Sequence, residues 1–242
     1  MTSIGIYGSL GRMGQAIAAV APELGARIAG GADAQDDPAI VAKAADVLID
    51  FSAPQALEAH LAAARAAGKP IVVGTTGLAA KHHALIDAAA GEIAALQTGN
   101  TSVGIGLLQR LVREAAAQLG PDWDIEIVEM HHRHKADAPS GTALMLGAAA
   151  AEGMGTSLPE AGVNGRAGLT GPRASGTIGM ASVRGGSVVG DHSVIFAAEG
   201  ERIELVHRAD DRAIFARGAV RAALWLAGQP AGRYTMDQVL GG

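Results

Sequence analysis

The chain has 242 residues, a net charge of −5 and no cysteine, which excludes a disulfide framework, a thiolate metal site and a cysteine nucleophile. Hydrophobic residues make up 49% of the chain but aromatic ones only 3%, so the core must be mainly aliphatic, as where helices cover a parallel sheet. The negative charge argues against general nucleic-acid binding, and no apolar run approaches the roughly 20 residues that span a bilayer. We expect a soluble, cytoplasmic protein whose N-terminus is a strand and not a leader.

Residues 1–102 alternate short apolar runs with helical stretches. Such alternation predicts right-handed crossovers and a Rossmann-like, doubly wound parallel sheet, and therefore an α/β domain. The expected strands cover residues 3–7, 26–31, 46–51, 70–73 and 93–96. The expected helices cover residues 12–21 and 55–67, with a third that ends near residue 90.

The pattern changes after residue 102, where longer helices and β-branched runs predict a second, α+β domain with an open mixed sheet. Helices are expected at 104–119, 142–152 and 211–227, and a strand at 123–130. The Gly-rich segment 153–176 has little periodicity, which is typical of a functional loop. Three further strands, at 177–184, 187–196 and 202–207, are separated by short turns, and we expect them to pair as hairpins.

A glycine-rich turn joins the first predicted strand to the first helix, with the sequence Gly8-Ser9-Leu10-Gly11-Arg12-Met13-Gly14. Glycines at such a turn let backbone N–H groups approach a pyrophosphate at the positive end of the helix. Asp33 follows the second strand, where a carboxylate can accept hydrogen bonds from an adenosine ribose. The turn therefore predicts dinucleotide binding, and the alternative is an ordinary βα turn beside a surface aspartate.

Two other turns follow predicted parallel strands, Gly74-Thr75-Thr76-Gly77 and Thr98-Gly99-Asn100-Thr101. Ligands of doubly wound sheets lie beyond the carboxyl ends of the strands. Small hydroxyl and amide side chains at this edge can admit a nicotinamide ring and hydrogen-bond its amide. The alternative is that these residues only form turns.

A basic cluster, His131-His132-Arg133-His134-Lys135, precedes the turn Pro139-Ser140-Gly141-Thr142 and an apolar helix. A metal site at the histidines lacks an evident third ligand and would face two neighbouring cations. A solvated basic loop is a second interpretation. The third is acid–base chemistry on an anion, since histidine and lysine carry protons and a helix start capped by Ser140 can hold a carboxylate. With the dinucleotide turn, this third interpretation predicts a nicotinamide-dependent oxidoreductase acting on an anionic metabolite.

The segments E-x-HHRHK-x-DAPSGTA, GxxGRMG, GTTG and N-x-SVG, with GTIGMASVRGG and GDHSVIFAAEGERIEL further on, resemble the 4-hydroxy-tetrahydrodipicolinate reductase (dihydrodipicolinate reductase) family. The resemblance runs essentially end to end. It implies reduction of an unsaturated cyclic dicarboxylate to tetrahydrodipicolinate in the diaminopimelate route to lysine. It also implies a homotetramer assembled through the open sheet, and a last helix that returns to the cofactor domain. The expected domains are therefore 1–102 with 212–242 for the dinucleotide, and 103–211 for substrate and assembly.

The resemblance also assigns roles to individual residues. His131 corresponds to the proton donor or acceptor and Lys135 to the proton donor, while His132, Ser140, Gly141 and Thr142 correspond to the substrate-binding region. Arg133 and His134 receive no role beyond keeping the site positive. The cofactor contacts correspond to Gly8, Ser9, Leu10, Gly11, Arg12, Met13, Asp33, Gly74, Thr75, Thr76, Thr98, Gly99, Asn100 and Thr101.

The chain departs from the family pattern at two positions. Many relatives have an arginine after the acidic ribose residue, where it can pair with the extra phosphate of NADPH, but here Ala34 follows Asp33. We therefore expect NADH to be preferred over NADPH by a modest factor, because Arg12 can still reach that phosphate. Leu10 stands where the common fingerprint has a glycine. The alternative functions are another NAD(P)-dependent amino-acid or semialdehyde dehydrogenase, a non-catalytic dinucleotide sensor and a metal-dependent hydrolase.

Overall fold

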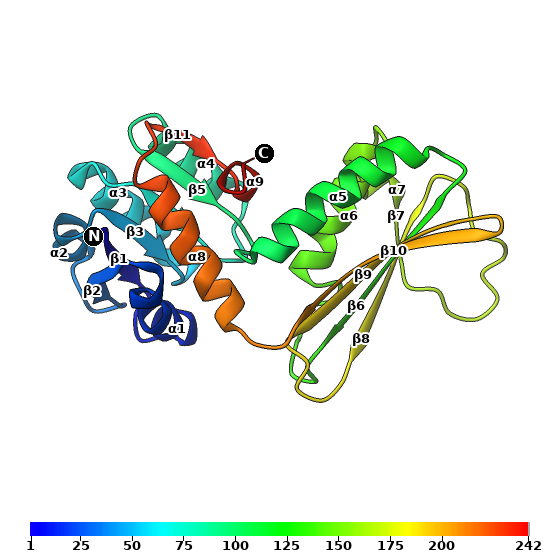
Figure 1. The fold of residues 1–242 in the computed structure, drawn as a ribbon, viewed down its shortest axis with the longest axis horizontal. Coiled ribbons are helices and arrows are strands. Elements are labelled where there is room, and N and C mark those ends of the chain that lie inside the picture. The colour runs from blue at the N-terminus through cyan, green and yellow to red at the C-terminus, as the bar shows by residue number, and fades with distance from the viewer. Residues whose placement is uncertain (242) are drawn as a thin grey trace. The chain divides into compact units, whose positions relative to one another are not determined.

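The computed structural model describes residues 1–241, and the chain forms two compact units. The first unit combines Met1–Val103 with the segment that starts at Arg212, and the second comprises Gly104–Asp211. Figure 1 shows a layered α/β arrangement in the first unit and two long helices against one sheet in the second. Each unit has a hydrophobic core of its own.

The first unit is built on a six-stranded sheet in the order β11-β5-β4-β3-β1-β2, and every neighbouring pair is parallel. Its strands are β1 (Ser3–Tyr7), β2 (Arg27–Ala32), β3 (Val47–Asp50), β4 (Ile71–Val73), β5 (Ala94–Gln97) and β11 (Gly232–Tyr234). Its helices are α1 (Arg12–Val20), α2 (Pro38–Ala44), α3 (Leu57–Ala67), α4 (Ala80–Ala90), α8 (Ala213–Leu226) and α9 (Met236–Val239), with short 3-10 turns at Pro22–Leu24 and Pro54–Ala56.

Alternating side chains of the strands fill cores on the two faces of this sheet. Val47 and Ile49 of β3 join the cluster with α1 and α8, whereas Leu48 joins the cluster with α2, α3 and α4. This alternation follows from the period of two in a strand, and Figure 1 shows α8 running across one face of the sheet. A sheet covered on both faces needs strands that are apolar throughout, which explains the buried run of β3.

The strand order places a topological switch point between β1 and β3. The chain runs from β1 to its neighbour β2 and then crosses to β3 on the other side of β1. The loops that leave the carboxyl ends of β1 and β3 therefore diverge and leave a crevice, which is where open α/β sheets bind ligands.

The second unit has a five-stranded mixed sheet in the order β10-β9-β6-β8-β7. Its elements are α5 (Val103–Leu119), β6 (Asp124–His131), α6 (Gly141–Gly153), α7 (Leu158–Ala161), β7 (Gly162–Asn164), β8 (Ile178–Arg184), β9 (Gly190–Ala198) and β10 (Glu201–Ala209). Helices α5 and α6 pack on one face (Figure 1). The other face carries the half-exposed valines Val128, Val183 and Val206.

The fold class is confirmed, and one pairing expected from the sequence is wrong. Strands β9 and β10 form the predicted hairpin, but β8 and β9 do not pair, because β6 lies between them, parallel to β8 and antiparallel to β9. The segment 185–189 must therefore pass over the end of β6, a span of two strand spacings, or about 10 Å. For this reason β9 begins at Gly190 and not at residue 187.

Some short elements do not stand out in the sequence. The segment expected to be an irregular loop, 153–176, contains α7 and β7, whose four and three residues are too few to show a period. The residue runs of α2, β11 and α9 also carry no clear pattern, yet β11 completes the sheet beside β5. These elements are stabilised by what they pack against and not by their own propensity.

We expect Gly218→Ala to destabilise the first unit although alanine favours helices over glycine. A Cβ at position 218 of α8 would lie 1.7 Å from the carbonyl oxygen of Thr101, so helix and loop must separate at a cost of about 1–3 kcal/mol in the free energy of unfolding. Gly228→Ala is the matched control, because its nearest neighbour would be 3.9 Å away. Thermal and urea denaturation measure the difference, and equal stabilities of the two variants would contradict the close approach.

Candidate active site

The first candidate site is a cavity of about 290 Å³ at the switch point between β1 and β3. The residues around it come from the glycine turn after β1, the end of β2 and the segment after β3. They are Gly8, Gly11, Ala32, Asp33, Ala34, Phe51, Ser52, Ala53, Ala56 and His60. The predicted glycine turn and Asp33 thus share one cavity.

Close backbone packing explains the glycines of the turn. Gly8 has φ of 80°, and a Cβ there would lie 2.7 Å from the carbonyl oxygen of Phe51. A Cβ at Gly14 would lie 2.3 Å from the oxygen of Gly8, so only glycine lets α1 start this close to the strand end. No non-glycine residue within 1–241 has a positive φ. Leu10 therefore needs no glycine conformation, and its side chain is 76% exposed.

The Asp33 carboxylate is fixed at the rim of this cavity. It accepts hydrogen bonds from the Ser9 hydroxyl at 2.6 Å and from the Leu10 backbone N–H at 3.1 Å. The next residue, Ala34, also lines the cavity and contributes no charge. Arg12, an exposed residue at the start of α1, is the cation that the glycine turn itself supplies.

The threonines predicted as cofactor contacts mainly use their hydroxyls within the protein. Thr75 donates to Asp50 Oδ1 at 3.1 Å, Thr98 to the Asn100 carbonyl at 2.8 Å, and Thr101 to the Phe215 carbonyl at 2.7 Å. These bonds hold the loops after β4 and β5 in shape. Of the remaining predicted residues, Thr76 and Gly99 are exposed and Met13 and Asn100 are partly exposed. Gly74 is buried where a Cβ would meet the Phe51 ring at 2.3 Å.

A polar network that the sequence did not indicate adjoins the cavity, which two of its members, Ser52 and His60, line. The buried Asp50 carboxylate contacts His60 Nδ1 at 2.9 Å and accepts from the Ser52 hydroxyl at 2.6 Å. The His60 ring stacks on Tyr7 with centroids 4.1 Å apart. Burial of the Tyr7 hydroxyl raises its pKa well above the ordinary value, and the negative charge of Asp50 raises it further. Asp50, His60 and Tyr7 come together only when β1, β3 and α3 pack.

The second candidate site lies at the end of β6 in the other unit. One face of this strand is buried along its whole length. The buried side chains are apolar at Ile125 and Ile127 and polar at Glu129 and His131, near the end of the strand. His131 Nδ1 lies 2.6 Å from Glu129 Oε2, so the ring donates Nδ1–H to the carboxylate. A Cβ at Gly190 would lie 3.0 Å from His131 Nε2, so the glycine leaves room beside that nitrogen.

Arg184 of β8 completes the surroundings of Glu129. Its Nη1 and Nη2 donate to the two carboxylate oxygens at 2.8 Å each. Burial alone would raise the pKa of Glu129, but hydrogen bonds from Arg184, Ser182 and His131 outweigh it and lower the pKa to about 2. Glu129 is therefore a buried carboxylate that stays charged.

The start of α6 is fixed to the same carboxylate. The Ser140 backbone N–H donates to Glu129 Oε1 at 3.2 Å, and its hydroxyl caps the helix by accepting from Ala143 N at 3.2 Å. The predicted cap is therefore confirmed. Gly141 and Thr142 form the first turn, at the positive end of a 13-residue helix. Ser140 itself is 1% exposed, so the groups at the surface of this helix end are those of Gly141 and Thr142.

The remaining cluster residues lie on the loop between β6 and α6. Lys135 Nζ pairs with Asp137 Oδ1 at 2.9 Å, and this hydrogen bond lowers the pKa of Asp137. The rings of His132 and His134 lie 6.3 Å apart, while Arg133 is exposed. The structure thus brings together His131, Ser140 and the helix start through Glu129.

No group of three or more histidine and carboxylate side chains suited to a metal ion occurs within residues 1–241. In the same range, no helix is both long and apolar enough to cross a membrane.

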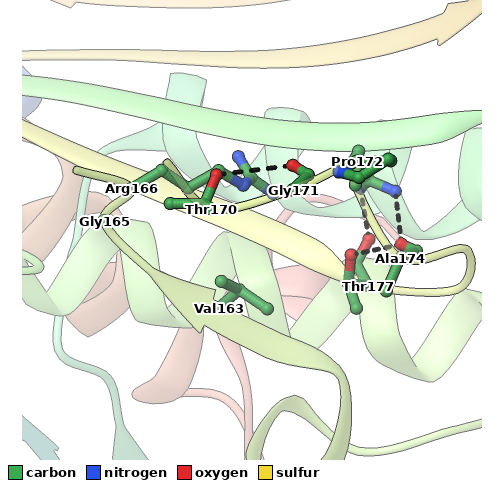
Figure 2. A pocket seen from close by; sticks show the side chains of 9 residues that line it. Val163, Gly165, Arg166, Thr170, Gly171, Pro172, Ala174 and Thr177 are labelled. Atoms are coloured by element: carbon green, nitrogen blue, oxygen red, sulfur yellow. Dashed lines mark hydrogen bonds between the residues drawn. The ribbon is translucent and has the colours of Figure 1, made fainter. Parts of the chain in front are cut away.

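A further hollow, of about 240 Å³, lies beside the loop 165–177, and Figure 2 shows Arg166, Thr170 and Thr177 around it. Arg166 and Arg173 there pair with the Glu126 carboxylate.

Comparison with known proteins relates both units of the chain to one family of enzymes. The chain matches the family models "Dihydrodipicolinate reductase, N-terminus" over residues 2–101 and "Dihydrodipicolinate reductase, C-terminus" over residues 104–240. The chain belongs to the dihydrodipicolinate reductase family. A 4-hydroxy-tetrahydrodipicolinate reductase of Zymomonas mobilis is 55% identical over 98% of this chain and 96% of that protein. One of Pseudomonas fluorescens is 54% identical over 81% of this chain and 73% of that protein.

Solved structures are similar in fold. A dihydrodipicolinate reductase from Paenisporosarcina, solved with bound dipicolinate, superposes with a TM-score of 0.76 over 97% of each chain at 22% identity. A probable dehydrogenase from Thermotoga maritima superposes with a TM-score of 0.61 at 12% identity, over 98% of this chain and 92% of that one. The architecture is therefore shared with dehydrogenases beyond this reductase family.

At the second candidate site, sequence reasoning missed Glu129, Arg184 and His192. Glu129 had a usable signal, because it precedes His131 by two residues on a predicted strand and must face the same side. Arg184 and His192 come from strands far along the chain, and only the sheet register brings them to β6. His192 shares a hydrogen bond of 3.1 Å with the Ser140 hydroxyl, and its ring meets that of His131 edge-on at 5.1 Å.

We expect His192 to make the stability of the second unit depend on pH. Burial, and then the charge of His131, lowers the pKa of His192 to about 4, whereas an unfolded histidine has a pKa of about 6.5. Between these values the unfolded chain binds more protons, so the free energy of unfolding falls as pH falls, by up to about 1.4 kcal/mol per unit. His192→Gln should flatten this slope in urea denaturation, and His134→Gln should keep it. An unchanged slope in His192→Gln would contradict the assignment.

Proposed function

We propose that the protein reduces 4-hydroxy-tetrahydrodipicolinate to tetrahydrodipicolinate with a nicotinamide dinucleotide, in diaminopimelate and lysine biosynthesis. The observation that carries the proposal is the His131–Glu129 pair beside the positive helix start at Gly141, within a chain of the dihydrodipicolinate reductase family. The first unit would bind the dinucleotide and the second unit the substrate. Replacing the substrate's hydroxyl with hydrogen consumes one hydride and one proton and releases water.

The dinucleotide fits the cavity of the first unit. Gly8 and Gly14 keep the turn free of side chains, and the positive end of α1 suits a pyrophosphate. The Asp33 carboxylate is placed to accept ribose hydroxyls at the cavity rim. A bound NADH or NADPH supplies the hydride. Ser9, Leu10, Gly11, Arg12 and Met13 complete the turn, and the loops Gly74–Thr76 and Thr98–Thr101 follow β4 and β5 at the same edge of the sheet.

The second unit supplies charge and protons for the substrate. Backbone N–H groups at Gly141 and Thr142, together with the helix dipole, suit one carboxylate of the dianion. Lys135 and His132 add positive charge and hydrogen-bond donors. His131 holds a proton at Nδ1 through Glu129 and exchanges protons at Nε2, and Lys135 is a second donor on the adjacent loop. Holding both carboxylates orients the ring and stabilises the charge that develops on it.

We expect His131→Gln and Lys135→Ala each to lower kcat by about a hundredfold or more, the usual contribution of a positioned proton donor. Substrate is generated in situ from pyruvate and aspartate semialdehyde, and loss of the reduced nicotinamide is followed at about 340 nm. His83→Gln on α4 is the control and should keep wild-type turnover. Near wild-type kcat in both variants would exclude these roles, and loss of activity with a chelator would point to a metal-dependent enzyme.

We also propose that NADH is preferred over NADPH. Ala34 provides no cation beside Asp33, so a ribose phosphate would face that carboxylate with only Arg12 to offset it. Ala34→Arg should raise kcat/KM for NADPH by about tenfold, as one charge-assisted hydrogen bond would. Ala34→Gln is the uncharged control. A wild-type enzyme with higher kcat/KM for NADPH than for NADH would show the preference to be wrong.

Assembly and location are further parts of the proposal. The open face of the second sheet carries exposed valines from β6, β8 and β10, and such a face is typically covered by a partner. Together with the family resemblance it supports a homotetramer formed through this sheet, in the cytoplasm, with no nucleic-acid or membrane partner. Sedimentation equilibrium of the purified protein tests the tetramer, and a monomer at micromolar concentration would contradict it.

A further inference from the structure

One ion pair in the second unit contacts His131, the residue before the start of α6 and the loop that carries Lys135. Glu129 and Arg184 lie on adjacent parallel strands, where Glu129 is opposite Ser182 and Arg184 is opposite His131. The Arg184 guanidinium meets both oxygens of Glu129 at 2.8 Å. The Glu129 side chain is 1% exposed and the Arg184 side chain 21% exposed, so this bidentate pair is largely shielded from water.

Three hydrogen bonds connect this pair to the cluster. Glu129 Oε2 accepts from His131 Nδ1 at 2.6 Å, and Oε1 accepts from the Ser140 backbone N–H at 3.2 Å. Arg184 Nη2 donates to the Asp137 carbonyl at 2.7 Å, and the Asp137 side chain in turn pairs with Lys135. The proton-bearing histidine, the lysine loop and the start of α6 are therefore all tied to one pair of side chains.

We propose that Glu129 and Arg184 are positioning residues for the reduction, which fix the proton-carrying nitrogen of His131 and set its place relative to Lys135 and the start of α6. The inference rests on the proposed function and deepens it. A carboxylate at Nδ1 holds the ring with Nδ1–H, so Nε2 is the nitrogen that gives or takes the substrate's proton. A neutral partner would leave the tautomer and the ring orientation less defined.

Arg184 has a second consequence, which concerns charge. Glu129 alone would place a negative charge beside the site for a dianionic substrate. The bidentate arginine neutralises it, so Glu129 can orient His131 while Lys135 and the helix end keep the cluster positive. The low pKa of Glu129 agrees with a pair that stays ionised on both sides.

A purely stabilising ion pair is the alternative, and β6 offers a matched comparison. Glu126 lies three positions before Glu129, faces the other side of the sheet and also pairs with arginines, Arg166 and Arg173 at 2.9 Å each. Within residues 1–241, no hydrogen bond or ion pair joins Glu126 to His131, Lys135 or Ser140. Buried ion pairs often contribute little net stability compared with apolar residues of similar volume, so we expect the unit to stay folded when both side chains of the pair at Glu129 are replaced.

The test compares three changes in the full-length protein. Glu129→Met with Arg184→Met removes both charges together, so no buried charge is left unpaired. Arg184→Lys keeps the charge but loses the bidentate geometry. Glu126→Gln is the control. Readouts are kcat and KM, NADH affinity by fluorescence, thermal stability, and the tautomer of His131 from ¹⁵N shifts of labelled histidine, assigned by comparison with His131→Gln.

We expect the double variant to stay folded, to bind NADH with wild-type affinity and to lose at least about tenfold in kcat. Its His131 should change from Nδ1–H to a mixture of tautomers. Arg184→Lys should be intermediate in kcat, and Glu126→Gln should be near wild type in both kcat and tautomer. A folded double variant with wild-type kcat, or with an unchanged His131 tautomer, would overturn the inference.

Turnover by the wild-type protein and the tautomer of His131 are measured independently, so failure of the proposed function and failure of this inference can be told apart. If the wild-type protein does not reduce the substrate, the proposed function fails, and the tautomer of His131 still decides whether Glu129 and Arg184 orient the ring. If the double variant does not fold, Arg184→Lys provides the comparison, since it changes one side chain and keeps its charge. Wild-type kcat and tautomer in Arg184→Lys would then count against the inference.

Discussion

The candidate catalytic region depends on one buried charge, the Glu129 carboxylate. A carboxylate shielded from water is tolerated only when its oxygens are satisfied, and here Arg184, His131 and the backbone of Ser140 satisfy them. His131 lies at the end of β6, Ser140 at the start of α6, and Arg184 also bonds the loop between them. The hydrogen bonds that satisfy this charge therefore fix the strand end, the loop and the helix start relative to one another.

The candidate sites of the two units are built from different chemical groups, backbone amides in the first and charged side chains in the second. In the first, crossing of the chain between β2 and β3 opens a crevice, and glycines at positions 8 and 14 let the backbone line it. In the second, charged side chains on β6 and β8 meet, beside the buried His192 of β9, at the end of a sheet whose inner face is mainly apolar. Backbone amides and a helix end suit a pyrophosphate, and a positive cluster suits a small dicarboxylate. These chemistries support the proposal that the first unit binds the dinucleotide and the second the substrate.

Most of the fold could be predicted because its main elements have a clear signal in the sequence. For β3 that signal is an unbroken apolar run and for α5 an amphipathic period, and both elements lie within a residue or two of their predicted bounds. The prediction failed where neighbours in sequence are not neighbours in space, as between β8 and β9, which β6 separates. Short elements such as β11 and α7 are stabilised by packing and leave no period to detect.

The sequence alone determined the chemistry that is available: the glycine turn, Asp33, and the run from His131 to Lys135 with its capped helix start. These features are local, so spacing and residue type identify them. The tertiary structure decided which groups meet. Arg184 and His192 reach β6 from strands far along the chain, and Thr75 and Thr101 turn their hydroxyls inward. Sheet register and burial set these contacts. Neither can be predicted from local spacing, because the residues that meet are distant from one another in the sequence.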